Sequence, residues 1–128
     1  MDPSGLKKIL VVDDEADWRD LHQMALENVG GFTLKLCDGG KMALKAAPAF
    51  KPDFMVLDVM IGDMTGMDLL KQLREVPSLQ KTPAIFVTAR AQAHESAEYK
   101  THDVVEVITK PYDPMTFADQ IREIYKKA

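Results

Sequence analysis

The chain has 128 residues, with 20 acidic and 16 basic side chains, so its formal net charge is −4. This length suits one domain over residues 1–128, and no apolar run is long enough to span a membrane. The acidic balance argues against direct binding of nucleic acid, and the single cysteine, Cys37, excludes an internal disulfide or a multi-cysteine metal cluster.

The first residues are polar and lack the apolar core of an export signal. We therefore expect residues 1–6 to be a frayed end and the protein to be cytoplasmic. Residues 9–12 form a short run rich in β-branched residues, which predicts a parallel strand buried on both faces. An amphipathic helix is predicted next, ended by two glycines at positions 30 and 31. Its predicted apolar face consists of Trp18, Leu21, Ala25 and Val29.

Residues 32–37 alternate between apolar and polar side chains, which predicts an edge strand. A short helix is predicted around Ala43 to Ala47, where Pro48 should end or kink it. The buried strand 54–57 follows, and then a helix defined by its leucines, Leu69, Leu70 and Leu73.

The last third of the chain repeats the same alternation of strand and helix. Residues 84–87 and 104–108 predict two more buried strands, separated by a weak, polar helix over residues 92–100. A final helix is predicted with Asp113 as its N-cap and Pro114 at its first helical position.

Five strands, each followed by a helix, indicate an α/β domain with a single doubly wound (βα)5 parallel sheet. Ligands of such sheets bind at the carboxyl ends of the strands, so the residues that end each run are the candidate site. The first run ends in Asp13 and Asp14, and the third ends in Asp58. The fourth and fifth runs end in Thr88 and Lys110.

If the first and third strands are neighbours, the three aspartates converge and their charges repel unless a cation is present. A hard ion such as Mg²⁺ satisfies such a site with carboxylates, carbonyls and waters. Lys110 adds a fixed positive charge and Thr88 a hydroxyl donor. A carboxylate nucleophile, a metal and two groups that neutralise phosphate oxygens are what phosphoryl transfer requires.

The sequence resembles the receiver domain of two-component response regulators over nearly its whole length. The resemblance implies a flavodoxin-like fold with strand order 2-1-3-4-5. Four motifs carry it in order, each at a strand end: VVDDE at 11–15, PDFMVLD at 52–58 running on to DMTGMDLL at 63–70, VTA at 87–89, and TKP at 109–111.

The resemblance also assigns roles to individual residues. It implies that Asp58 is the phosphoacceptor and that Asp14 binds Mg²⁺ directly. Asp13 would act mainly through a metal-bound water, and the backbone carbonyl of Met60 would be a further ligand. Lys110 would contact the phosphoryl group, and Thr88 would swing inward to bond it.

The implied partners are a histidine kinase or a histidine phosphotransfer protein, or a small acyl phosphate as donor. By the resemblance, phosphorylation would alter the surface built from the helix expected over 92–100, the strand 104–108 and the final helix, and so the affinity for a downstream protein. Neither direct nucleic-acid binding nor membrane insertion is expected. Dimerisation on phosphorylation stays open, as does whether the chain stands alone or is part of a longer regulator or hybrid kinase.

Four residues, at three places in the chain, depart from the usual pattern of the family. Val107 stands where an aromatic residue is usual, Asp103-Val104 where Gly-Ala is common, and Gly62 where a proline is usual. Without the aromatic residue, we expect phosphorylation to change mainly the backbone of residues 89–100. A receiver-like interaction module that signals without phosphorylation is the alternative that Val107 leaves open.

Met60 and Arg90 are predicted to set the lifetime of the phosphoryl group. By the resemblance they flank the approach of the hydrolytic water, and neither can act as a base. Met60 is also evidence against an aspartyl-phosphate phosphatase, which requires a second aspartate at that position. A flavin carrier needs a phosphate cradle after the first strand, where this chain has Asp13, Asp14 and Glu15.

Other candidate residues have structural interpretations. Cys37 is predicted to be a core thiol. The histidines His22, His94 and His102 have no mutual spacing that indicates a metal site, and we interpret each as a surface residue. Trp18 should face the core one turn past Asp14, close enough to report on the pocket.

Overall fold

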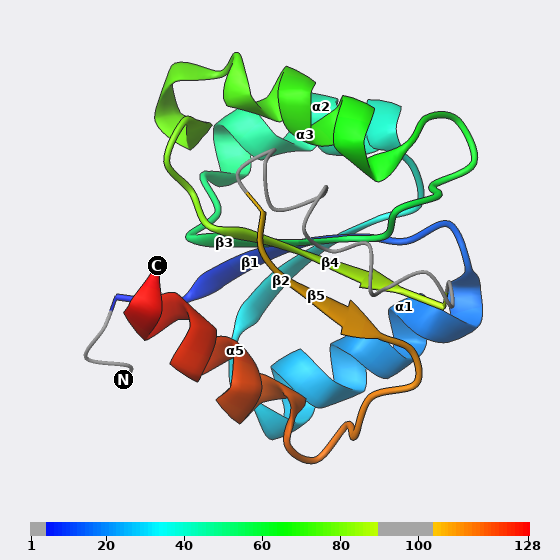
Figure 1. Cartoon of the computed structure of the whole chain (residues 1–128), viewed down its shortest axis with the longest axis vertical. Helices are drawn as coiled ribbons and strands as arrows, with labels where there is room; N and C mark the ends of the chain where they lie inside the picture. The colour runs from blue at the N-terminus through cyan, green and yellow to red at the C-terminus, as the bar shows by residue number, and fades with distance from the viewer. Residues whose placement is uncertain (1–4, 90–103) are drawn as a thin grey trace.

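The computed structural model describes residues 5–89 and 104–128. Five parallel strands form one sheet with the order β2-β1-β3-β4-β5 (Figure 1). This result confirms both the predicted parallel sheet and its predicted strand order. The strands are β1 (Lys8–Val12), β2 (Thr33–Cys37), β3 (Phe54–Leu57), β4 (Ala84–Thr88) and β5 (Val104–Thr109).

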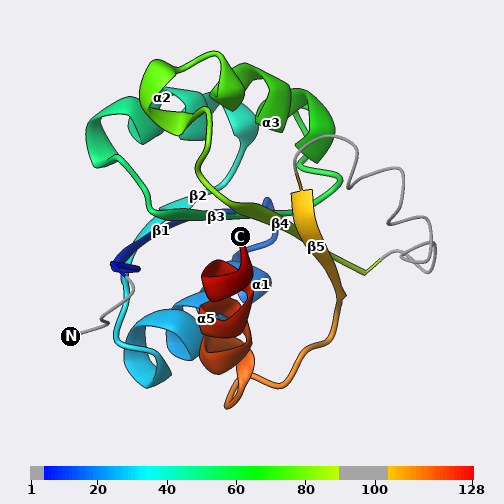
Figure 2. The same cartoon turned by 60° about the vertical axis from the view of Figure 1, so that its left-hand side comes forward.

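Helices cover both faces of the sheet (Figure 2). One face carries α2 (Gly40–Phe50) and α3 (Gly66–Arg74), and the other carries α1 (Ala16–Gln23), its continuation η1 (Met24–Val29) and α5 (Phe117–Lys127). A short 3₁₀ turn, η2 (Pro77–Leu79), precedes β4. The helix predicted over residues 92–100 lies outside the described residues. Within the described part of the chain, no helix is long and apolar enough to cross a membrane.

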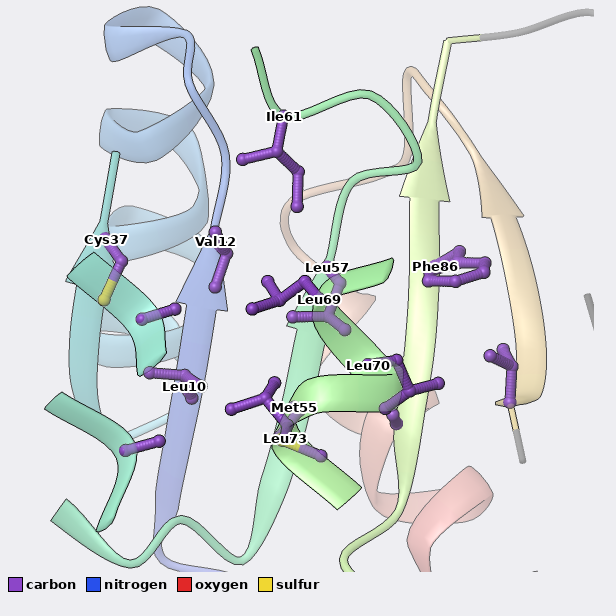
Figure 3. Close-up of a cluster of buried hydrophobic side chains, with 14 of the residues drawn as sticks. Leu10, Val12, Cys37, Met55, Leu57, Ile61, Leu69, Leu70, Leu73 and Phe86 are labelled. Carbon is purple, nitrogen blue, oxygen red and sulfur yellow. The ribbon is translucent and has the colours of Figure 1, made fainter. Parts of the chain in front are cut away.

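Two hydrophobic layers hold the helices to the sheet. Figure 3 shows the layer under α2 and α3, where Leu10 and Val12 of β1 and Met55 and Leu57 of β3 point toward Leu69 and the other leucines of α3. The intervening residues of the same strands belong to the opposite layer under α1 and α5. Successive side chains of a strand point to opposite faces, so strands covered on both sides must be apolar at every position.

The first helix differs from its predicted form. Its second half, η1, is a π-helix, in which hydrogen bonds span five residues and the repeat lengthens. The buried residues are therefore His22, Ala25 and Leu26, whereas Val29 is 41% exposed. The predicted apolar face was wrong at Val29, because its spacing assumed a regular α-helix.

Pro48 lies inside α2 instead of ending it. The helix continues to Phe50, and Lys51 then turns left-handed with φ of 54° and donates its N–H to the Ala47 carbonyl. A proline disturbs only the turn that precedes it, and Pro48 stands so close to the end that just two helical residues follow.

Both ends of the chain also differ from their predicted boundaries. The final helix begins at Phe117, since Asp113 first closes a separate turn: its Oδ1 accepts the Met115 N–H and its carbonyl accepts the Phe117 N–H. At the N-terminus, Leu6 is 1% exposed and packs in the layer under α5. Leu6 is thus part of the folded domain and not of a frayed end.

Candidate functional site

The carboxyl ends of four strands bring four polar side chains into one pocket. Asp13 directly follows β1, Asp58 follows β3, Thr88 ends β4 and Lys110 follows β5. These strands are adjacent in the sheet, and all four side chains are buried. Because the strands are otherwise apolar, these residues are buried by their position at the sheet edge and must find polar partners there.

Lys110 is the centre of the pocket. Its Nζ lies 2.8 Å from Asp13 Oδ2 and 2.8 Å from Asp58 Oδ2, so one ammonium donates to two carboxylates. Burial by itself would lower the pKa of Lys110, but these two hydrogen bonds and the two negative charges raise it overall. The lysine therefore stays charged in the pocket, and that charge offsets the repulsion between Asp13 and Asp58.

The two bridged carboxylates differ in their access to solvent. The side chain of Asp13 is 1% exposed, whereas that of Asp58 is 10% exposed. Burial would raise the pKa of Asp13, but hydrogen bonds from His22, Lys110 and the Glu15 N–H lower it overall. Asp58 Oδ1 accepts only a long hydrogen bond of 3.3 Å from the Met60 N–H. Asp58 is thus the more accessible of the two carboxylates.

Asp14 does not join the other two aspartates around Lys110. Its side chain is exposed, and its Oδ2 lies beside Gly62, where an added Cβ would come within 3.1 Å of it. Within residues 5–89 and 104–128, no three His, Cys, Asp or Glu side chains are grouped as a metal site. We expected three carboxylates to converge; in the structure Lys110 brings together two of them, Asp13 and Asp58.

This donor set still fits Mg²⁺. Mg²⁺ is bound in proteins by one or two carboxylates and keeps several of its waters, so it does not need a cage of three side chains. Asp13 and Asp58 would be such a pair, and the Met60 N–H donates to Asp58 Oδ1, so the backbone of Met60 lies beside that carboxylate. Exposed Asp14 adds a carboxylate that can turn toward a hydrated ion.

His22 belongs to the pocket, and its interpretation as a surface residue was wrong. It is 1% exposed, with Nε2 3.1 Å from Asp13 Oδ2 and Nδ1 2.6 Å from the Tyr112 hydroxyl oxygen. No spacing rule could reveal it, because its partners lie nine residues before and ninety residues after it in the chain. The histidine partners a carboxylate, and the other two histidines, His94 and His102, lie outside the described residues.

Trp18 is half-buried on α1 and borders the pocket. The Lys110 Nζ lies 4.5 Å from the centroid of its ring, a cation–π contact. The Trp18 ring is also 5.7 Å from the rings of His22 and Tyr112. This direct contact with Lys110 supports the prediction that Trp18 can report on the pocket.

Thr88 and Met60 differ strongly in their exposure to solvent. Thr88 is 2% exposed, and its carbonyl accepts the Lys110 N–H at 2.8 Å, which fixes the two strand ends together. Met60 is 51% exposed, unusually high for its type. Arg90 and most of the segment 89–100, to which we assigned lifetime and readout roles, lie outside the described residues.

The first turn of α3 packs directly against the backbone of Asp58. Thr65 caps the helix by accepting the Asp68 N–H at its Oγ1, and the Gly66 N–H donates to the Val59 carbonyl at 2.6 Å. A Cβ at Gly66 would lie 2.1 Å from the Asp58 carbonyl oxygen, closer than any real contact. Only glycine permits this approach.

Asp63 fixes the loop that follows the pocket. Its carboxylate accepts the N–H groups of Gly40 and Lys41, at 2.9 and 3.1 Å, and so caps α2 from a different part of the chain. These hydrogen bonds lower the pKa of Asp63. The motif around position 63 contained this aspartate, but its sequence gave no indication of a partner 22 or 23 residues earlier.

Two other sequence predictions concern the core. Val107 is half-buried and packs against the layer under α2 and α3. This position of β5 therefore holds a small aliphatic side chain where the family usually has an aromatic ring. Cys37 is fully buried, and burial raises the pKa of its thiol to about 11. The prediction of a core thiol is confirmed.

Comparisons with known proteins show the family to which the chain belongs. Residues 9–122 match the response regulator receiver domain family. The chain is 33% identical over 122 residues to the alkaline phosphatase synthesis transcriptional regulatory protein PhoP of Bacillus subtilis, covering 95% of this chain and 50% of PhoP. It is 30% identical over 120 residues to the chemotaxis protein CheY of Pseudomonas aeruginosa, covering 94% of this chain and 97% of CheY.

Solved structures show the same fold. The chemotaxis response regulator CheY4 of Vibrio cholerae has a TM-score of 0.83 at 24% identity, covering 93% of this chain and 98% of CheY4. A CheY-like receiver domain protein of Methanospirillum hungatei has a TM-score of 0.82 at 25% identity, covering 96% of each chain. The chain thus spans about half of PhoP but nearly all of CheY.

Proposed function

Since the chain belongs to the response regulator receiver domain family, we propose that it is a phosphorelay switch in which Asp58 accepts the phosphoryl group. Domains of this family are signalling switches rather than enzymes that release a product. The observation that carries the proposal is the position of Lys110 Nζ, 2.8 Å from both Asp58 and Asp13. The ammonium of Lys110 is thus a fixed cation beside Asp58, whose side chain is more exposed to solvent than that of Asp13.

The proposed reaction is an in-line displacement. An Asp58 carboxylate oxygen attacks phosphorus, forming a P–O bond while the P–N bond of a phosphohistidine breaks and its electron pair returns to the imidazole. With an acyl phosphate as donor, the bond that breaks is P–O. Charge accumulates on the three equatorial oxygens of the phosphoryl group. Lys110 neutralises part of that charge, and the hydroxyl of Thr88, at the end of the neighbouring strand β4, would donate to the phosphoryl group.

We propose that Asp13, Asp14, Asp58 and the Met60 backbone carbonyl hold Mg²⁺ in the working protein. The ion supplies positive charge for the phosphoryl oxygens, beyond what Lys110 provides. The residues themselves prepare the site: Lys110 keeps Asp13 and Asp58 close together, and the strand ends keep both carboxylates at the same edge of the sheet.

The proposed partners are a histidine kinase or histidine phosphotransfer protein upstream and a downstream protein that binds the altered surface. In the described residues, the expected output face comprises β5 and α5. Val107 provides no aromatic side chain that could follow Thr88 inward, so the route of readout differs from the usual aromatic one. PhoP is named a transcriptional regulatory protein, and this chain spans 50% of its length.

The test is transfer from a small acyl phosphate with Mg²⁺, followed by intact-mass measurement. Wild type should gain one phosphoryl group that is stable in acid and labile in base, and Asp58→Asn should gain none. Lys110→Ala should slow the uptake about 10²-fold, the usual cost of removing one donor to a developing oxyanion.

A matched control is Asp68→Asn, which removes an exposed carboxylate on α3 outside the pocket. It should be labelled at the wild-type rate. A full mass increase in Asp58→Asn would place the acceptor elsewhere and refute the assignment.

A further inference from the structure

His22 and Tyr112 form a buried polar chain behind Asp13. His22 lies on α1, Tyr112 follows β5, and the two ring systems are nearly parallel with an interplanar angle of 16°. Nδ1 of His22 is 2.6 Å from the Tyr112 hydroxyl oxygen, and Nε2 is 3.1 Å from Asp13 Oδ2. Both ring nitrogens thus have a partner in an interior where an unsatisfied polar group would be costly.

The partners determine the direction of the two hydrogen bonds. Asp13 meets the ammonium of Lys110 at Oδ2 and the Glu15 N–H at Oδ1, and a carboxylate in such contacts can only accept from the imidazole. The proton of a neutral imidazole must then reside on Nε2, which leaves Nδ1 as an acceptor for the Tyr112 hydroxyl. Burial and the charge of Asp13 raise the pKa of Tyr112, so its hydroxyl keeps the proton that it donates.

The hydroxyl of Tyr112 is itself held in place by neighbouring rings. The Tyr112 ring stacks on Phe117 at 3.8 Å between centroids, with an interplanar angle of 18°, and lies 5.7 Å from Trp18. Phe117 is fully buried in the first turn of α5. The position of the hydroxyl is therefore defined by α5, on the far side of the imidazole from Asp13.

Asp13 is held at both of its oxygens. Oδ2 accepts from His22 and Lys110, and Oδ1 accepts the Glu15 N–H at 3.0 Å. Lys110 also donates to Asp58, so it cannot orient Asp13 independently. His22 is the side-chain donor that serves Asp13 alone.

We propose that His22 is a positioning residue of the pocket: its Nε2–H orients Asp13 for Mg²⁺, and the Tyr112 hydroxyl fixes the imidazole tautomer that does so. This role rests on the proposed function, in which Asp13 is a metal ligand. Groups that hydrogen-bond a metal ligand from behind typically contribute 10- to 100-fold to metal affinity.

The first measurement is Mg²⁺ affinity, followed by the backbone amide resonances of Asp14 and Val59. Tyr112→Phe, which keeps the ring and its stacking, should bind Mg²⁺ about 10-fold more weakly, and His22→Leu more weakly still. His22→Gln, whose side-chain amide can donate to Asp13, should recover much of what His22→Leu loses. The control is Tyr125→Phe, which removes the hydroxyl of a tyrosine on α5 and should leave the Mg²⁺ affinity unchanged.

The second measurement is the ¹⁵N spectrum of the His22 imidazole, which does not depend on Mg²⁺ or on transfer. Wild type should carry its proton on Nε2, with Nδ1 as an acceptor, and Tyr112→Phe should shift the Nδ1 resonance. This readout also decides the matter if His22→Leu fails to fold. If the wild-type imidazole carried its proton on Nδ1 and not on Nε2, His22 could not donate to Asp13, and the proposed positioning role would be refuted.

The two possible failures can be told apart. If Tyr112→Phe and His22→Leu bind Mg²⁺ as tightly as wild type while Asp58 is still phosphorylated, the positioning role is wrong and the proposed function stands. If wild type itself takes up no phosphoryl group on Asp58, the proposed function is wrong and the role built on it falls with it.

Discussion

Trp18 and Lys110 are in direct contact, with the ammonium 4.5 Å from the centroid of the indole ring. The same ammonium bridges two carboxylates of the pocket. A change in the charge of the pocket therefore acts on a cation that lies over the only tryptophan of the chain.

Binding of Mg²⁺ should change the fluorescence of Trp18, because the ion attracts the carboxylates that hold Lys110. A titration of wild type with Mg²⁺ should saturate, and a chelator should reverse the change. Asp14→Ala should require at least about 10-fold more Mg²⁺ if Asp14 is a ligand. Equal midpoints for the two proteins would remove Asp14 from the metal site.

Gly66→Ala should destabilise the domain and disturb the acceptor. The new methyl group would meet the Asp58 carbonyl oxygen at 2.1 Å, and neither backbone can yield easily. We expect a loss of at least about 3 kcal/mol in the free energy of unfolding, measured by urea denaturation. Gly31→Ala is the control: its Cβ would meet nothing within 4 Å, and only its φ of +79° costs about 1 kcal/mol. Similar losses in both variants would contradict the packing argument.

Met60→Asn should shorten the lifetime of the phosphorylated form. Met60 is 51% exposed beside Asp58, and its thioether is too weak an acceptor to orient a water for attack. An amide at this position can hold that water. The measurement is the decay of phosphorylated protein after the donor is removed. Adding Arg90→Glu should speed the decay further, and a wild type that decays as fast as this double variant would refute the predicted role of Met60 and Arg90 in setting the lifetime.

The stability that Asp63 provides should depend on pH. The hydrogen bonds from Gly40 and Lys41 hold its folded pKa below its ordinary value of about 3.9. Its contribution is therefore complete above about pH 4 and is lost as the pH falls through the lowered folded pKa. The carboxyl carbon resonance of Asp63 should titrate below pH 3.9, and the Gly40 and Lys41 amides should exchange faster once it is protonated. Titration at or above the ordinary value would show that this cap is not formed in solution.

Much of the fold and the principal pocket residues could be predicted from local patterns. Each apolar run is short and ends in a chemically distinctive residue, so the runs located the strands and their ends located Asp13, Asp58, Thr88 and Lys110. The strand order came from the family resemblance, because periodicity does not determine which strands are neighbours.

The remaining features depend on contacts between distant parts of the chain. A buried histidine has the same local sequence as an exposed one, and only Asp13 and Tyr112 together make His22 an interior residue. The cap from Asp63 to α2 is likewise invisible to any short window of sequence. The π-helical turn escaped prediction because it changes the period on which the helical pattern relies.

The close approach of Gly66 to Asp58 also has a mechanical consequence. With no space between the start of α3 and the end of β3, these two pieces of backbone can only move as one rigid body. A shift of the Asp58 backbone should therefore move the first turn of α3 with it, because the two are in direct contact. We therefore expect any change in the pocket to fall mainly on its other side, where Lys110 contacts Asp13 and Asp58 through side chains that can rotate.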